Sequence, residues 1–145
     1  GRRPGDRAFV LAALRLVIER RARWEPVLEV EGHGRAAFAL VANCSPYTYA
    51  GPLALRLVPE ASFDAGIDLV APVEVRPRLL PRLAWYAVRG PRRARPDLLL
   101  YVHDAERIVV RCDEPLPMQL DGEDVGDVVE VAFESEPGAV VVLVP

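Results

Sequence analysis

Apolar residues recur with a helical period in two segments and alternate with polar residues over most of the remaining chain. The first segment, residues 7–23, ends before Pro26, which cannot continue a helix. The second, residues 78–88, ends at Gly90. One face of the first segment is formed by Val10, Leu11, Leu14, Val17 and Ile18. We expect a helix in each segment.

The rest of the chain has the pattern of short strands. Gly32-His33-Gly34 predicts a hairpin turn with an exposed histidine, and residues 43–52 and 59–66 are expected to be loops. The fold class we predict is mainly β, an antiparallel β-sandwich with two peripheral helices. The predicted strands are residues 27–31, 35–43, 53–58, 67–75, 108–112, 118–120, 128–133 and 140–144.

The size and charge of the chain limit its class. Its 145 residues predict a single domain, 1–145, and a hydrophobic fraction of 51% excludes a disordered chain. No apolar run reaches the roughly 20 residues that a membrane-spanning helix needs. Residues 1–95 carry 16 Arg against 9 acids, whereas residues 96–145 carry 2 Arg against 12 acids. The two halves are therefore expected to attract each other or different partners.

The cysteines and His103 give weak signals. Cys44 and Cys112 lie far apart and match no metal-binding spacing, so we expect free thiols, with one disulfide left open. His103 lies next to Asp104, but we give little weight to a metal site there.

The segment 115–123 ends in an acidic corner, Asp121-Gly122-Glu123. Asp-Gly is a favoured pair for a two-residue hairpin turn, because glycine adopts a positive φ without strain. We therefore expect the Glu123 carboxylate at the tip of a hairpin. From these residues alone two interpretations stay open, a solvated acidic turn and a base that acts on a substrate.

Two loops precede this corner, and the three segments in this order form a more specific pattern than any one of them alone. Residues 43–51 (Asn-Cys-Ser-Pro-Tyr-Thr-Tyr-Ala-Gly) place an asparagine before aromatic residues and a glycine. Residues 59–68 (Pro-Glu-Ala-Ser-Phe-Asp-Ala-Gly-Ile-Asp) follow, and Gln119–Glu123 has the form Q-x-D-G-E. In this order the segments resemble those of the bacterial diacylglycerol kinase-like lipid kinases. The resemblance extends from the first predicted helix to Pro145.

The resemblance implies a domain with a defined role. Members of this family have an N-terminal α/β domain, whose Gly-Gly-Asp-Gly-Thr loop binds most of the ATP, and a C-terminal β-sandwich. That loop does not occur in this sequence, so the chain would be the C-terminal domain, with the ATP-binding domain elsewhere in the same polypeptide. The activity implied is phosphorylation of a lipid hydroxyl of the diacylglycerol type, with Glu123 as general base. The chain alone is expected to be inactive.

The family also implies a magnesium site in the second loop, and here the chain departs from the pattern. Backbone oxygens at Ser62 and Ile67 match expected ligands, but Ala65 stands where the family has a ligating Asp. Asp64 is a substitute one residue away. A metal-free turn is the other interpretation. A decayed metal site motivates the alternative function, a non-catalytic lipid-binding or regulatory module.

The segment Arg76–Arg95 carries seven arginines interleaved with leucines, Trp85 and Tyr86. A basic amphipathic helix of this kind favours peripheral contact with a membrane surface. The alternative is a helix packed on the sheets with solvated arginines. We expect no nucleic acid partner, because the chain is net acidic and has no recognised binding motif. The expected location is the cytoplasm, with peripheral contact to a membrane.

Overall fold

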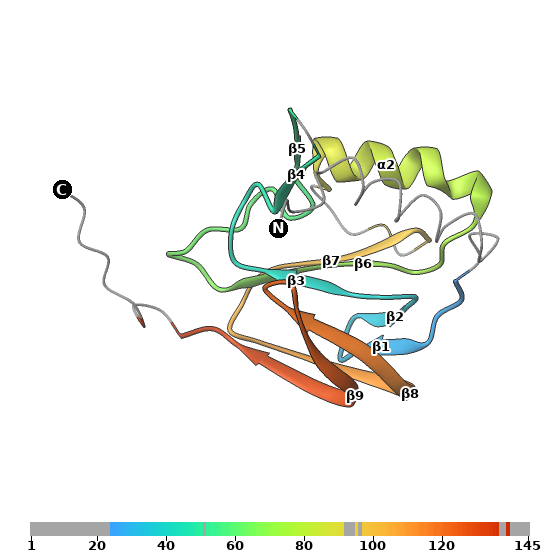
Figure 1. Ribbon diagram of the computed structural model, residues 1–145, viewed down its shortest axis with the longest axis vertical. Coiled ribbons are helices and arrows are strands. Elements are labelled where there is room, and N and C mark those ends of the chain that lie inside the picture. Colours follow the sequence, from blue (N-terminus) through green and yellow to red (C-terminus); the bar gives the residue numbers. More distant parts are fainter. Residues whose placement is uncertain (1–23, 51, 92–94, 96, 137–138, 140–145) are drawn as a thin grey trace, which may run out of the picture.

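The computed structural model describes residues 24–50, 52–91, 95, 97–136 and 139 (Figure 1). The helix expected over 7–23 and the strand expected over 140–144 lie outside these residues. The elements in chain order are β1 (Leu28–Val30), β2 (Gly34–Ala36), β3 (Leu40–Ala42), β4 (Thr48–Ala50), β5 (Leu53–Leu55), β6 (Ile67–Pro72), η1 (Pro77–Leu79), α2 (Leu80–Arg89), β7 (Leu99–Ala105), β8 (Arg107–Leu120) and β9 (Glu123–Glu134).

The strands form antiparallel sheets. One sheet has the order β2-β1-β8-β9, a second has the order β3-β6-β7, and β4 and β5 pair separately as a hairpin. The predicted class, mainly antiparallel β, is confirmed, and the helix expected over 78–88 is formed by η1 and α2. The narrower description as a β-sandwich stays a prediction.

Strand β6 is central to both apolar clusters, because all six of its residues are buried. Ile67, Leu69 and Ala71 point to one side, where they join residues of β1, β2, β7 and β8 in a shared core. Val70 points to the other side and packs in a second cluster with Val58, beneath α2. Figure 1 shows the resulting order: α2 lies on one side of β3–β6–β7, and β1, β2, β8 and β9 lie on the other.

Several strand boundaries were predicted wrongly. The segment 35–43 is not one strand: β2 ends at Ala36 and β3 begins at Leu40, and these two strands belong to different sheets. Residues 43–52 are not all loop, since they contain β4. Strand β7 was not predicted at all. Strand β6 ends at Pro72, which has no N–H to continue the ladder, and Val75 forms only an isolated bridge with Trp24.

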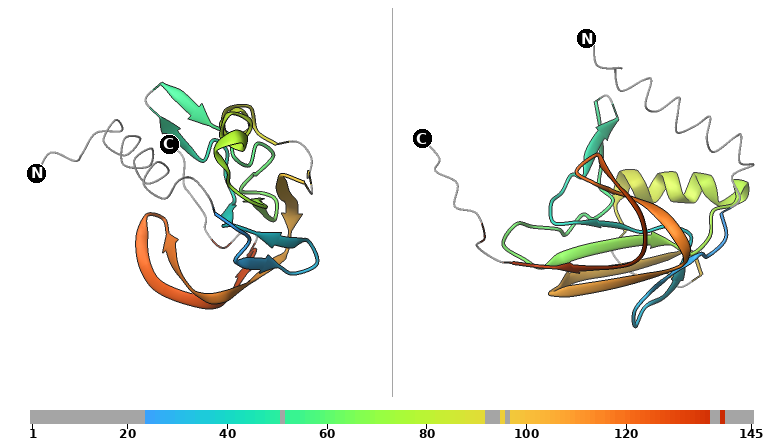
Figure 2. Two further views of the ribbon diagram at one scale, coloured as in Figure 1. Left: turned by 90° about the vertical axis from the view of Figure 1, so that its right-hand side faces the viewer. Right: turned by 60° about the horizontal axis from the view of Figure 1, so that its bottom comes forward.

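The two strands predicted at 108–112 and 118–120 are one continuous strand, β8. Pro115 lies within the register shift of this strand, and Pro117 lies just after it. Between the pairs Arg111↔Glu130 and Leu116↔Val128, residues 112–115 of β8 stand opposite Val129 alone. Such a bulge bends the strand that carries the extra residues. The left view of Figure 2 shows the long β8–β9 hairpin strongly curved.

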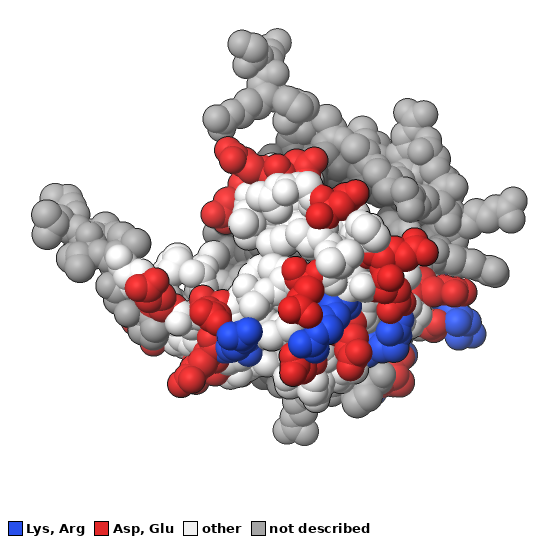
Figure 3. Space-filling model, turned by 90° about the horizontal axis from the view of Figure 1, so that it is seen from below, with Lys and Arg blue, Asp and Glu red and all other residues white. Residues whose placement is uncertain are grey.

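The outer face of this hairpin and of β1 carries cross-strand ion pairs. Arg111 lies 2.7 Å from Glu130, its direct partner across the hairpin, and 3.1 Å from Glu31. Arg107 lies 2.6 Å from Glu134, and Arg35 pairs with Asp113. Seen from below, acidic and basic side chains intermingle on this face (Figure 3). The arginines here are therefore compensated by neighbouring carboxylates.

Candidate functional site

The acidic corner forms the tip of the β8–β9 hairpin, as predicted. Asp121 and Gly122 have φ values of 49° and 86°, as the two central residues of a type I′ turn require. Glu123 is the first residue of β9 and lies directly opposite Leu120, so both side chains are on the same face of the hairpin. All of these residues are exposed. The turn chemistry places the Glu123 carboxylate in solvent, next to an apolar side chain.

Glu123 differs from its acidic neighbour Asp124. The Asp124 carboxylate accepts a hydrogen bond of 2.9 Å from the Gly126 N–H, at a bulge where Val125 has no partner on β8. Within the described part of the chain, the Glu123 carboxylate has no hydrogen bond or ion pair. No donor in the described part of the chain therefore competes for the oxygens of Glu123.

Two apolar side chains near this end of the hairpin are not buried. Leu120 and Val125 are each 49% exposed. Leu120 lies directly opposite Glu123, and Val125 lies two residues further along β9. The tip therefore combines an exposed carboxylate with exposed apolar side chains.

The second predicted site, the loop around Ala65, is a tight turn fixed to β7. The Ala65 N–H donates to the Ser62 carbonyl (3.1 Å), and the Asp64 N–H donates to the Ser62 hydroxyl (3.3 Å). The Gly66 N–H donates to Asp104 Oδ1 (2.7 Å). A Cβ on Gly66 would lie 2.5 Å from the Ala105 carbonyl oxygen, so only glycine allows this close approach.

This loop offers a poor donor set for magnesium. Ala65 has no carboxylate, Asp64 is exposed, and the Ser62 carbonyl already accepts a hydrogen bond. Ile67 is paired with Ala105 in the sheet. Nowhere in the described part of the chain do three or more His, Cys, Asp or Glu side chains form a group that could hold a metal ion. Because a hard cation takes several oxygen ligands, including charged ones, these residues do not fit the ion well.

Asp68, the one buried charged or polar residue in the described part of the chain, lies next to this loop and was not predicted as a site. The side chain of Asp68, a residue of β6, is fully buried and accepts hydrogen bonds from three groups of β7. The Asp104 N–H lies 3.0 Å from its Oδ1, and the Tyr101 hydroxyl lies 3.3 Å from its Oδ2. His103 Nδ1 lies 2.9 Å from Oδ1 and 3.0 Å from Oδ2. We call these four residues the Asp68 cluster.

The Asp68 cluster is held together by a backbone irregularity. The register of β6 and β7 shifts between Ile67 and Leu69, and Asp104 adopts a positive φ of 54°. This conformation aims its N–H at Asp68 while its carboxylate reaches Gly66. The Tyr101 hydroxyl also reaches Glu60 at 3.4 Å. Burial and the nearby charge of Asp68 raise the pKa of Tyr101 above its ordinary value.

The arrangement gives His103 a structural partner. Its Nδ1 is held by Asp68, and the Asp104 carboxylate is occupied by the Gly66 N–H. A signal for this cluster was present in the sequence: Asp68 stands in the apolar run Ile67–Pro72, and a buried carboxylate needs several donors. Its partners lie on β7, which the pattern of residues did not reveal.

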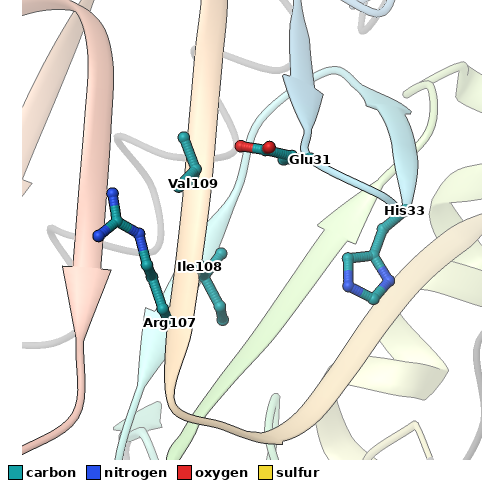
Figure 4. Close-up of a pocket in the computed structure, with 5 residues that line it drawn as sticks. All are labelled: Glu31, His33, Arg107, Ile108 and Val109. Atoms are coloured by element: carbon teal, nitrogen blue, oxygen red, sulfur yellow. The ribbon is translucent and has the colours of Figure 1, made fainter.

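A shallow pocket lies beside the β1–β2 turn, lined by Glu31, His33, Arg107, Ile108 and Val109 (Figure 4). His33 is exposed in this turn, as expected. The charged groups of the pocket have other partners, since Glu31 pairs with Arg111 and Arg107 pairs with Glu134. We assign no chemistry to this pocket.

The two thiols are free and partly buried, in agreement with the prediction. Burial, followed by the charge of Asp113, raises the pKa of the Cys112 thiol. A raised pKa leaves little reactive thiolate at neutral pH, so Cys112 is not suited to nucleophilic catalysis.

The arginines of the segment Arg76–Arg95 are distributed over three environments. Arg76 lies 2.5 Å from Glu74, Arg78, Arg82 and Arg89 are exposed on η1 and α2, and Arg95 donates to the Tyr86 hydroxyl at 3.5 Å. Arg92 and Arg93 lie outside the described residues. No helix in the described part of the chain has the length and apolar character needed to cross a membrane.

No protein family model matches the chain, and no curated protein matches it.

Proposed function

We propose that the chain is the lipid-substrate domain of an ATP-dependent lipid kinase of the diacylglycerol kinase type, with Glu123 as the general base. The observation that carries the proposal is the exposed Glu123 carboxylate at the hairpin tip, without a described partner and beside exposed apolar side chains. The ordered resemblance of the three sequence segments supports it.

In the proposed reaction, Glu123 has one role, which is to accept a proton. The hydroxyl oxygen of the lipid attacks the γ-phosphorus of ATP, a new O–P bond forms, and the bond from the γ-phosphorus to the bridging oxygen of ADP breaks. The hydroxyl proton passes to Glu123. The apolar side chains Leu120 and Val125 would contact the lipid beside its hydroxyl. The nucleotide would be bound by the separate domain of the same polypeptide, and no step is assigned to magnesium.

The test uses the natural polypeptide that contains this chain. Replacing Glu123→Gln keeps the shape of the side chain but removes the base, so phosphate transfer from labelled ATP to diacylglycerol should fall by about 100-fold or more in kcat. The matched control is Asp127→Asn, which removes an exposed carboxylate further along β9 and should leave kcat within about threefold. Transfer that is unchanged in the Gln variant would refute the role of Glu123.

Ala65 favours one alternative function, a non-catalytic lipid-binding or regulatory module. The same assay separates the two. If the unaltered polypeptide binds diacylglycerol in mixed micelles but transfers no phosphate with any metal ion supplied, the alternative replaces the kinase. The isolated 145-residue chain is expected to be inactive under either function.

A further inference from the structure

Helix α2 is attached to the rest of the fold through one face. Leu83 and Tyr86 pack against the cluster around Val58. The Arg56 N–H donates to the Ala87 carbonyl at 2.8 Å, and a Cβ on Gly90 would lie 2.7 Å from Pro59 Cγ. These contacts fix the rotation of the helix about its axis, so the composition of its opposite face is a fixed property of the structure.

The opposite face is apolar, whereas a surface helix ordinarily exposes charged and polar residues. Pro81, Ala84 and Trp85 are exposed there, and Trp85 is 59% exposed. At about 100° per residue, Arg82 and Arg89 lie close together along one border of this face. The Arg89 guanidinium carbon lies 4.7 Å from the centre of the Trp85 ring, within the range of a cation–π contact. We call the five side chains the α2 outer face.

Among the described residues, the arginines of η1 and α2 have no carboxylate partners of the kind found on the sheets. Residues 77–89 contain no Asp or Glu. In the described part of the chain, no carboxylate lies within ion-pair distance of Arg78, Arg82 or Arg89. By contrast, the arginines on the sheet, Arg35, Arg107 and Arg111, all have carboxylate partners.

We propose that the α2 outer face binds the surface of an anionic lipid bilayer. The helix would lie parallel to the bilayer, with Trp85 at the level of the headgroups and the arginines on anionic phosphates. Its ten residues are too few to span a bilayer. The inference stands independently of the kinase proposal, since it involves another surface and needs no phosphate transfer.

Two observations favour a bilayer over a nucleic acid. Pro81, Ala84 and Trp85 form an exposed apolar surface. Partial burial of this surface among acyl chains lowers the free energy, whereas contact with a phosphate backbone would leave most of its apolar area in water. The acid-rich hairpin β8–β9 lies on the other side of the β3–β6–β7 sheet from α2 (Figure 1). An anionic surface would therefore attract the side with α2 and repel the side with the hairpin, which orients the molecule.

The test measures sedimentation of the 145-residue chain with vesicles. Binding is expected on vesicles of phosphatidylcholine and phosphatidylglycerol, not on phosphatidylcholine alone, and it should weaken as salt is added. The double variant Arg82→Gln/Arg89→Gln should bind at least about tenfold more weakly. Trp85→Ala should also weaken binding but leave its salt dependence. In a Trp24→Phe background, Trp85 emission should shift to the blue on binding.

The matched control is Arg107→Gln/Arg111→Gln, which removes the same charge from arginines that already have carboxylate partners. It should bind vesicles within about twofold of the unaltered chain. An equal loss in both double variants would overturn the proposal, because net charge alone would then control binding. Tighter binding to a single-stranded DNA oligonucleotide than to the anionic vesicles would overturn it in favour of a nucleic acid partner. Circular dichroism verifies that each variant is folded.

Discussion

Two carboxylates in this molecule, Asp68 and Glu123, are placed in opposite ways. Asp68 is fully buried, and its oxygens accept hydrogen bonds from a peptide N–H, a phenol and an imidazole. Glu123 is exposed at a hairpin tip and has no described partner. A carboxylate whose acceptor sites are filled by the fold stabilises structure, and one whose sites are left open can take a substrate proton. The difference separates a structural acid from a candidate catalytic one.

The largest expected effect is on Asp68. Replacing Asp68→Ala removes the acceptor of the Asp104 N–H and of His103 and leaves the Tyr101 hydroxyl with Glu60 alone, which should lower the free energy of unfolding by about 3 kcal/mol. Urea denaturation followed by circular dichroism measures it. A loss below about 1 kcal/mol would mean that water satisfies these donors in place of the carboxylate and would end the structural assignment.

The second largest loss of stability is expected at Gly66. The variant Gly66→Ala forces a methyl group toward the Ala105 carbonyl oxygen, and the backbone must move apart at the cost of roughly 2 kcal/mol. The control is Gly34→Ala: its Cβ would meet only Leu100 Cδ2, at an ordinary 3.8 Å. Gly34 has a positive φ, which Gly66 does not, so the Gly34 variant reports backbone strain without a steric clash. A loss below about 0.5 kcal/mol in Gly66→Ala would contradict the importance of close approach at Gly66.

Tyr101 should give a smaller, pH-dependent effect. Its folded-state pKa is raised above the unfolded value of about 10, so the folded protein holds the phenolic proton more tightly. The associated stability is fully present below about pH 10 and is lost as the pH rises above it. Tyr101→Phe should cost about 1 kcal/mol at neutral pH and weaken this alkaline dependence. A dependence as steep as that of the unaltered protein would show that another group is responsible.

The smallest expected effect on stability is at the tip. Glu123→Gln should change the free energy of unfolding by less than about 0.5 kcal/mol, since its carboxylate takes part in no described interaction. Thermal denaturation of the Asp68 and Glu123 variants side by side tests the comparison directly. A Glu123 variant as unstable as Asp68→Ala would make both carboxylates structural.

Local chemistry explains which parts of the structure could be predicted. The turn at Asp121-Gly122 depends on two adjacent residues, so the position of Glu123 followed from the sequence. The helix α2 followed from its period and from Gly90. The division of 35–43 between two sheets did not follow, because apolar side chains continue through Ala37 and Phe38 and the change of partner depends on distant strands.

The Asp68 cluster could not be assembled from the sequence for a similar reason. Strand β7 follows an arginine- and proline-rich stretch, and it is defined by its pairing with β6. Without β7, Tyr101 and His103 had no assigned position relative to Asp68. The expectation for a metal at Asp64 depended on family resemblance and stays a prediction; the sequence itself already shows Ala65 where the family has a ligating Asp.

The register shift in β8 has a consequence for which residues can be substituted during evolution. Beyond residues 112–115, the hairpin continues to its tip with largely exposed side chains, while the segment before them carries Ile108 and Val110 of the core. Substitutions near the tip therefore leave core packing intact. The bulge divides one strand into a part constrained by folding and a part open to variation, so the residues of the tip can diverge while the scaffold is inherited unchanged.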